Sequence, residues 1–340
     1  MLKTKIICTI GPSTQSETMI HELVENGMDI ARLNFSHGSY KWHKDAMDKI
    51  KYWSNKLNKP VALLCDLQGP KIRVANFDNP PRELEKDEQI ILASPDSKNI
   101  NQGDIIIDDK YLNTDVKVGD PILIDDGKIE LKVLAINDGK IICKVIIGGN
   151  LYPHKGLNAP STKTTTSSIT EKDKKDLEFI LPLKPEYIAI SFVQTENDVL
   201  NLRKLVNNKN IKIISKIEKA QAIENFTKIA NASDAIMVAR GDLGVEIPIE
   251  RLPFIQKSII KQCNEHKQFV ITATQMLASM VDSPTPTRAE VTDIANAVLD
   301  GTTAVLLSNE TAVGKYPLQS LNIMKKIIIE AEKYLNAQIK

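Results

Sequence analysis

The sequence lacks the features that mark secreted, membrane-spanning and nucleic-acid-binding proteins. Its four cysteines include no Cys-x-x-Cys pair, which argues against a disulfide framework and against a structural zinc site. No signal peptide precedes the first strand-like segment, and no apolar run approaches the length of a membrane span. The formal net charge of +1 argues against electrostatic binding of nucleic acid or acidic membranes. We therefore expect a reduced, cytoplasmic protein that binds neither.

Several common catalytic motifs are also missing. The chain has no Gly-x-x-x-x-Gly-Lys-Ser/Thr loop and no Gly-x-Gly-x-x-Gly fingerprint for nucleotides, and no Gly-x-Ser-x-Gly elbow supports a hydrolase. Because histidine pairs at metal-ligand spacing are absent too, a metal site is expected to use oxygen ligands, which suit Mg²⁺ or Mn²⁺. Four of the histidines are expected at the surface: His21, His43, His154 and His266.

What the sequence does have is a regular alternation of apolar and amphipathic segments. Short apolar runs that are typical of buried strands alternate with helical stretches such as 16–26 and 196–207. This alternation predicts a parallel sheet, and eight such strands predict an α/β fold of the (β/α)8 TIM-barrel type. The predicted strands are 4–10, 28–33, 60–66, 186–191, 211–216, 234–238, 268–273 and 302–307.

The region between the third and fourth predicted strands breaks this alternation. Asp125-Asp126-Gly127 and Asn137-Asp138-Gly139 separate β-branched runs, and Asp-Gly steps favour tight hairpin turns. We predict a small all-β, barrel-like domain inserted at 72–167. The remaining segments, 1–71 and 168–340, amount to roughly 240 residues, which is close to the size of one (β/α)8 barrel.

Polar residues gather where the predicted barrel strands end, which is where (β/α)8 enzymes build their active sites. Lys216 and Glu218 follow one strand and share a face, because side chains alternate along a strand. The next strand ends in Arg240-Gly241-Asp242. Two carboxylates, a lysine and an arginine at neighbouring strand ends suit a divalent metal ion and an anionic, phosphorylated substrate.

Other strand ends add further polar residues, namely Arg32, Asn34, Ser36, Asp66 and Thr274. Each candidate also has a structural interpretation. Arg32 and Asp66 could form ion pairs, and Thr274 could cap the following helix. Lys216 and Glu218 could be a structural ion pair in the barrel mouth. The convergence of matched charges from independent strands on one rim favours a functional site.

Long stretches of the chain, in order, resemble pyruvate kinase. They are 4–12, 31–38, 66–73, 214–218, 237–248, 272–280, 286–300 and 307–317, and they cover essentially the whole sequence. The resemblance implies transfer of the phosphoryl group of phosphoenolpyruvate to ADP, which gives pyruvate and ATP in the last step of glycolysis. It also implies Mg²⁺ or Mn²⁺ as the divalent cation.

The resemblance further implies a role for each catalytic candidate. Lys216 and Arg32 would lie against the transferred phosphoryl group, where cations offset its charge. Glu218 and Asp242 would be ligands of the divalent cation. Thr274 would orient the substrate and relay a proton toward the enolate carbon.

Substrate and nucleotide contacts follow from the same resemblance. The backbone N–H groups of Gly241 and Asp242 would receive the substrate carboxylate, where a glycine allows close approach. The nucleotide phosphates would contact Asn34, His37, Arg73 and Lys155. Since Lys155 belongs to the inserted β domain, that domain would act as a lid that closes on nucleotide and metal and excludes water.

The chain departs from the family pattern near its predicted monovalent-cation site. Potassium-dependent members have threonine and glutamate where this chain has Leu67 and Lys71. The other positions of that site are intact: Asn34, Ser36 and Asp66. Our hypothesis is that the Lys71 ammonium replaces the monovalent cation, so that K⁺ is not required.

A second expected departure is that the chain lacks the C-terminal α/β domain of most family members. That domain carries the usual effector site, so we expect no response to sugar phosphates or AMP. Arg288 follows the capping-box residue Thr287 and matches an arginine at a barrel–barrel interface of the family. This match favours a homodimer.

Two other functions remain open from the residues alone. A (β/α)8 lyase or aldolase acting on a 2-oxo acid also holds Mg²⁺ with a glutamate and an aspartate at strand ends, although it needs no nucleotide lid. A catalytically impaired barrel that only binds metabolites is the non-enzymatic alternative.

Overall fold

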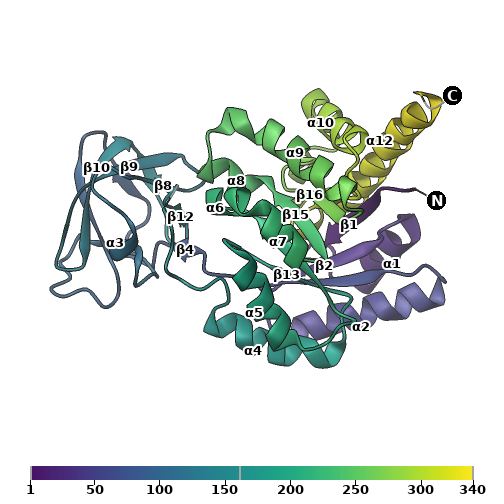
Figure 1. The fold of residues 1–340 in the computed structure, drawn as a ribbon, viewed down its shortest axis with the longest axis horizontal. Helices are drawn as coiled ribbons and strands as arrows, with labels where there is room; N and C mark the ends of the chain where they lie inside the picture. The colour runs from purple at the N-terminus through teal and green to yellow at the C-terminus, as the bar shows by residue number, and fades with distance from the viewer. Residues whose placement is uncertain (1, 161, 339–340) are drawn as a thin grey trace.

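The computed structural model describes residues 2–160 and 162–338, and Figure 1 shows two parts of the chain. A barrel with surrounding helices makes up most of the molecule, and a β-rich unit coloured blue to teal projects from one side of it. The predicted domain ranges 1–71, 72–167 and 168–340 include residues 1, 161, 339 and 340, which lie outside the described residues.

Eight parallel strands close into the predicted barrel. They are β1 (Lys5–Thr9), β2 (Ile30–Asn34), β3 (Ala62–Asp66), β13 (Tyr187–Ile190), β14 (Lys212–Ile217), β15 (Ala235–Ala239), β16 (Phe269–Ala273) and β17 (Ala304–Leu307). Around the barrel the order is β1-β17-β16-β15-β14-β13-β3-β2. All eight predicted strands are therefore confirmed, with ends that differ from the observed ones by two residues at most.

Alternation along each strand produces two apolar cores. Ile7, Leu64 and Ile214 belong to a cluster with at least one member from every barrel strand, which fills the barrel interior. Their neighbours Ile6 and Cys8 pack instead into the larger cluster between strands and helices. Because both faces of a parallel sheet are covered, the strands appear in sequence as continuous apolar runs.

Helices cover the outside of the barrel. They are α1 (Glu17–Asn26), α2 (Tyr40–Lys56), α4 (Glu171–Ile180), α5 (Glu196–Val206), α6 (Ala220–Glu224), α7 (Phe226–Ala232), α8 (Arg240–Glu246), α9 (Leu252–Glu265), α10 (Arg288–Leu299), α11 (Asn309–Ala312) and α12 (Pro317–Gln338), with short 3-10 segments at Leu181–Leu183, Ile249–Arg251 and Ala278–Val281. Both helices named from the sequence are confirmed, and so is the Thr287–Glu290 capping box. Within the described residues, no helix combines the length and apolarity that crossing a membrane requires.

The inserted unit lies between β3 and α4. It contains β4 (Ile72–Arg73), β5 (Arg82–Leu84), β6 (Gln89–Ala93), β7 (Ile105–Ile106), α3 (Leu112–Asp115), β8 (Pro121–Ile124), β9 (Ile129–Asn137), β10 (Lys140–Ile147), β11 (Gly149–Leu151) and β12 (Gly156–Asn158). Seven of these strands form one sheet, and a bridge between Val74 and Ile107 joins its two edges into a barrel-like shape. The predicted boundaries at 72 and 167 stay a prediction.

A separate core and tight turns hold this unit together. Its apolar cluster runs from Val74 to Ala159 and is distinct from the two barrel clusters. Asp138 and Gly139 connect β9 and β10 with positive φ values of 50° and 79°, as the Asp-Gly step predicts. The unit begins and ends side by side, because β4 pairs with β12 through Arg73 and Gly156.

Candidate active site

The ends of three barrel strands bring four charged side chains into one buried cluster. Arg32 Nε lies 2.7 Å from Asp66 Oδ2, and Lys216 Nζ lies 3.3 Å from the other oxygen of Asp66. Lys216 Nζ is also 3.0 Å from Glu218 Oε1. All four continue the inward-facing register of apolar residues that fill the barrel, so they meet at its mouth. The sequence-predicted convergence of these side chains is therefore what the fold produces.

Burial and pairing act in opposite directions on the ionisation of this cluster. Burial alone would lower the pKa of Lys216, but the carboxylates of Asp66 and Glu218 outweigh it and raise that pKa. Burial would likewise raise the pKa of Asp66, which Lys216 and Arg32 instead hold below its usual value. The surrounding carboxylates thus favour the charged ammonium form of Lys216, although only 12% of its side chain is exposed.

The two predicted metal ligands sit on neighbouring segments and influence each other. Burial, together with the charge of Asp242, raises the pKa of Glu218, although Lys216 opposes this. Glu218 Oε2 accepts the Phe192 N–H at 2.8 Å, and Asp242 Oδ1 pairs with Lys71 Nζ at 2.8 Å. The oxygen atoms of Glu218 and Asp242 are ligands of the kind that Mg²⁺ and Mn²⁺ prefer.

Most of the charges in this cluster are already paired with one another. Three cations and three carboxylates form these ion pairs: Arg32, Lys71 and Lys216, and Asp66, Glu218 and Asp242. A phosphorylated anion that entered this mouth would meet cations whose charge is offset by carboxylates. A divalent cation held by the carboxylates would add positive charge there.

Helix α8 begins directly after β15 and places Gly241 beside Thr274. The Gly241 N–H, predicted to receive the substrate carboxylate, donates instead to Thr274 Oγ1 at 2.7 Å. Thr274 and Gln275 both have positive φ, 71° and 57°. The next helical segment starts only at Ala278, with Leu277 at its cap position, so Thr274 is not a helix cap. The Arg240 guanidinium donates to the Thr274 carbonyl oxygen at 2.7 and 3.1 Å and fixes this turn.

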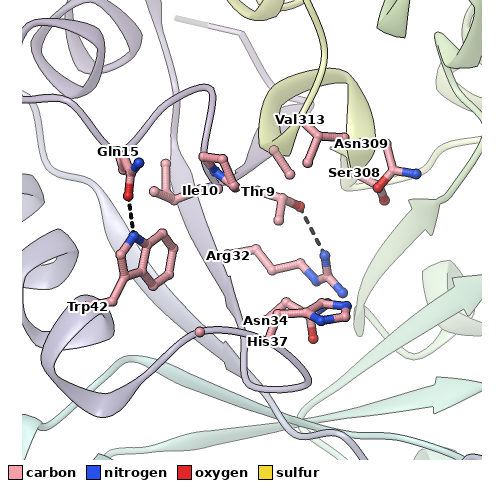
Figure 2. A pocket seen from close by; sticks show the side chains of 14 residues that line it. Thr9, Ile10, Gln15, Arg32, Asn34, His37, Trp42, Ser308, Asn309 and Val313 are labelled. Atoms are coloured by element: carbon pink, nitrogen blue, oxygen red, sulfur yellow. Dashed lines mark hydrogen bonds between the residues drawn. The ribbon is translucent and has the colours of Figure 1, made fainter. Parts of the chain in front are cut away.

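A cavity of about 590 Å³ opens next to Arg32 (Figure 2). The Arg32 guanidinium donates to Thr9 Oγ1 at 3.0 Å on one side, and Asn34 and His37 lie beside it. Across the cavity, the Trp42 indole N–H is hydrogen-bonded to Gln15. Sequence reasoning missed Trp42. Trp42 could have been noticed because it lies in the first turn of the helix that Ser39 caps, directly after the loop that carries His37.

The predicted nucleotide residues divide between barrel and inserted unit. Partial desolvation and the charges of Arg73, Arg32 and Lys172 lower the pKa of His37. Arg73, at the base of the unit, and Arg32, in the barrel, therefore both lower the pKa of the same histidine. Lys155 Nζ pairs with Asp125 of the same unit at 2.8 Å, so its predicted contact with nucleotide stays a prediction.

The residues of the predicted monovalent-cation region make contacts within the protein. Asn34 Oδ1 accepts the Ser36 N–H at 3.1 Å, and Asp66 is already engaged by Arg32 and Lys216. Lys71 turns toward Asp242, a predicted metal ligand. Among the described residues, no ion pair joins Lys71 to Asp66.

The structure also shows the positions of His43 and Arg288, which lie outside the charged cluster. The surface prediction for His43 is wrong, since His43 is 1% exposed and its ring stacks on Phe35 at 4.1 Å. His43 Nε2 contacts the His37 carbonyl oxygen at 2.9 Å and so ties down the loop that carries His37. Arg288 begins α10 and is exposed, and the neighbouring Asp293 pairs with Arg240 at 2.6 Å. The interface role of Arg288 stays a prediction.

Comparisons with known proteins identify the family of this barrel. A family model described as the barrel domain of pyruvate kinase matches residues 1–321. The pyruvate kinase of Clostridium perfringens (strain 13 / Type A) is 44% identical over 339 residues, which cover 99% of this chain and 72% of the relative. The pyruvate kinase of Staphylococcus saprophyticus is 46% identical over 337 residues, or 98% of this chain and 57% of the relative.

A solved structure gives the same result. The crystal structure of a pyruvate kinase from Cryptosporidium parvum superposes with a TM-score of 0.92 at 40% identity, over 98% of this chain and 70% of that one. The chain thus spans only part of the length of these relatives, 72% of the clostridial protein and 57% of the staphylococcal one. On the strength of the matched barrel and these identities, the chain belongs to the pyruvate kinase family, a family of phosphotransferases.

Proposed function

We propose that the chain transfers the phosphoryl group of phosphoenolpyruvate to ADP and releases pyruvate and ATP. The observation that carries the proposal is the buried Lys216 ammonium, held between Asp66 and Glu218 at the barrel mouth. Arg32, which pairs with Asp66 in the same charged cluster, also lines the cavity of about 590 Å³. A fixed cation held by two carboxylates, with a second cation that lines a ligand-sized cavity, suits a reaction in which charge builds up on phosphoryl oxygens.

Each barrel residue has a role in this proposal. Lys216 and Arg32 bind the phosphoryl oxygens and stabilise the charge that spreads over them during transfer. Glu218 and Asp242 hold the divalent cation, which when bound supplies charge neutralisation of the substrate oxygens. Gly241 offers its N–H to the substrate carboxylate once Thr274 gives up that hydrogen bond. The freed Thr274 hydroxyl then orients the proton donor for the enolate carbon.

The cavity beside Arg32 suits the nucleotide. The indole face of Trp42 and the apolar side chains of Pro12 and Val313 line it, and these surfaces accept a planar base. The phosphates would extend past Asn34 and His37 toward Arg73. We propose that the inserted unit closes over them, so that Lys155 exchanges Asp125 for a nucleotide phosphate. Closure excludes water, which would otherwise compete as phosphoryl acceptor.

A coupled lactate dehydrogenase assay with phosphoenolpyruvate, ADP and Mg²⁺ tests the reaction. Wild type is expected to form pyruvate only when ADP is present, and Lys216→Ala is expected to abolish this activity. Lys212→Ala is the matched control, because Lys212 is exposed at the other end of the same strand. Pyruvate release from a 2-oxo acid without nucleotide would instead indicate the lyase or aldolase alternative.

We also propose that the activity needs no K⁺. Lys71 supplies a fixed positive charge within 2.8 Å of Asp242, at the edge of the predicted monovalent-cation region. The test compares wild type and Lys71→Glu in tetramethylammonium buffer with and without K⁺. Wild type is expected to be equally active in both, whereas Lys71→Glu becomes K⁺-dependent. A wild type that is inactive until K⁺ is added would refute the hypothesis.

We further propose a homodimer formed through the barrels. Ile249 and Phe254 are 65% and 72% exposed, an unusual exposure for large apolar side chains on adjacent segments. Arg288 is also exposed. Light scattering coupled to size exclusion is expected to give a dimer for wild type and a monomer for Phe254→Glu. The cytoplasmic location predicted from the sequence stays a prediction.

A further inference from the structure

A second buried polar cluster lies where the inserted unit meets the barrel. Asn158 Nδ2 donates to Glu246 Oε1 at 2.9 Å, and Lys219 Nζ donates to the same oxygen at 3.0 Å. Asn158, Lys219 and Glu246 are 7%, 6% and 1% exposed. None of these residues was a candidate from the sequence, and none belongs to the charged cluster around Lys216.

The cluster joins three segments that matter for the site. Asn158 ends β12, which lies on the side of the inserted unit that faces α6 and α8 (Figure 1). Lys219 directly follows Glu218, and Glu246 ends α8, the helix that begins with Arg240, Gly241 and Asp242. One glutamate oxygen thus connects the inserted unit to both segments that carry the predicted metal ligands.

The Glu246 carboxylate depends on few hydrogen bonds. Glu246 Oε2 is buried without a hydrogen-bond partner, so Oε1 carries every contact that the carboxylate makes. Among the described residues, Lys219 is the ion-pair partner of this carboxylate, which is removed from water. If either Asn158 or Lys219 were lost, the buried carboxylate would have too few hydrogen bonds and too little opposite charge around it. A buried charge without these partners favours a local rearrangement. The rearrangement would reach α8, because α8 is seven residues long and Glu246 is its last residue.

We propose that Asn158, Lys219 and Glu246 form a positioning cluster that couples the inserted unit to helix α8 and to Glu218. When the unit moves, Asn158 carries the displacement to Glu246, and α8 carries it to Asp242. The orientation of Glu218 and Asp242, the two predicted metal ligands, then depends on the position of the inserted unit relative to the barrel. The coupling itself rests on contacts in the structure, whereas its consequence for metal binding rests on the proposed function.

Hydrogen–deuterium exchange of the ligand-free protein tests the coupling without any assay of activity. Asn158→Ala removes the donor, and Asn158→Leu removes it while keeping about the same volume, in case the smaller residue destabilises β12. Asn150→Ala is the matched control, because Asn150 is an exposed asparagine in β11 of the same unit. Peptides from 240–246 are expected to exchange roughly tenfold faster in both Asn158 variants, and peptides from α1 are expected not to change.

Direct Mn²⁺ binding, followed by electron paramagnetic resonance, provides a second readout. Both Asn158 variants are expected to bind Mn²⁺ about threefold to tenfold more weakly, and the control variant as tightly as wild type. Unchanged exchange in 240–246, or equal acceleration in every peptide including α1, would overturn the proposed coupling. Faster exchange in 240–246 together with a wild type that binds no Mn²⁺ would support the coupling and refute the metal site of the proposed function.

Discussion

Two lysines of the candidate site are held in opposite ways. In the barrel, Lys216 is 12% exposed and lies between two carboxylates that are 1% exposed. In the inserted unit, Lys155 is 37% exposed and pairs with Asp125, which is 17% exposed. Breaking the buried arrangement leaves charges unpaired away from water, whereas water screens a partly exposed pair and lowers the cost of exchanging its partner. The barrel therefore supplies the fixed part of the site, and the inserted unit supplies the exchangeable part.

The largest effect is expected from a substitution that keeps the positive charge of residue 216 and changes the shape of the charged group. Lys216→Arg is expected to lower kcat by roughly a hundredfold, because a planar guanidinium cannot occupy the space between Asp66 and Glu218 in the same geometry. Lys212→Arg, at the exposed end of β14, serves as control. Steady-state kinetics measure the effect, and a loss below threefold would mean that Lys216 is not held rigidly.

At Lys155, we expect the affinity for ADP to depend on the positive charge of the side chain and not on its shape. Lys155→Met is predicted to raise KM for ADP about tenfold with little change in kcat, and Lys155→Arg to restore most of the affinity. Kinetics at varied ADP separate the two constants. A kcat that falls as far as in Lys216→Arg would place Lys155 in the fixed part of the site.

The contact between the two parts can be disturbed at Gly156. A methyl group on Gly156 would lie 2.8 Å from Lys71 Cε, so Gly156→Ala is expected to push this flexible side chain away from Asp242. The apparent affinity for Mg²⁺ should change by about threefold. In a Lys71→Ala background the same substitution should have no effect, and additive changes in the double variant would show that Gly156 acts by another route.

The smallest expected effect concerns pH and the loop that carries His37. Burial lowers the pKa of His43, so the folded protein resists protonation there more than the unfolded chain does. The unfolded state then binds more protons below its ordinary histidine pKa, and stability falls as pH drops from 7 to 5. Urea unfolding should show a smaller loss of stability between pH 7 and pH 5 for His43→Gln than for wild type. His266→Gln, at an exposed position, serves as the control.

Much of the barrel and its rim could be predicted because the signals are local. Side-chain alternation fixes that Lys216 and Glu218 face the same way as Ile214, which fills the barrel interior. The burial of His43 was also available, since His43, Ala46, Met47 and Ile50 share one helical face.

Other contacts had no local signal. Asn158 and Glu246 are 88 residues apart and meet only because the inserted unit packs against α8. The partner of Lys71 depends in the same way on β12, whose Gly156 lies against the lysine stem. Neither composition nor periodicity carries information on how two separately folded cores come together.

The pairing of β4 with β12 also bears on how the chain folds. Barrel closure must bring β3 next to β13 across the whole intervening segment, and an unfolded loop of that length carries a closure entropy that grows with the logarithm of its length. Once the inserted unit has folded, Arg73 and Gly156 are paired neighbours, so the effective loop shrinks by about 80 residues. An early-folding insert would therefore accelerate closure of the barrel, and turns such as Asp138-Gly139 would influence a folding rate measured far from them.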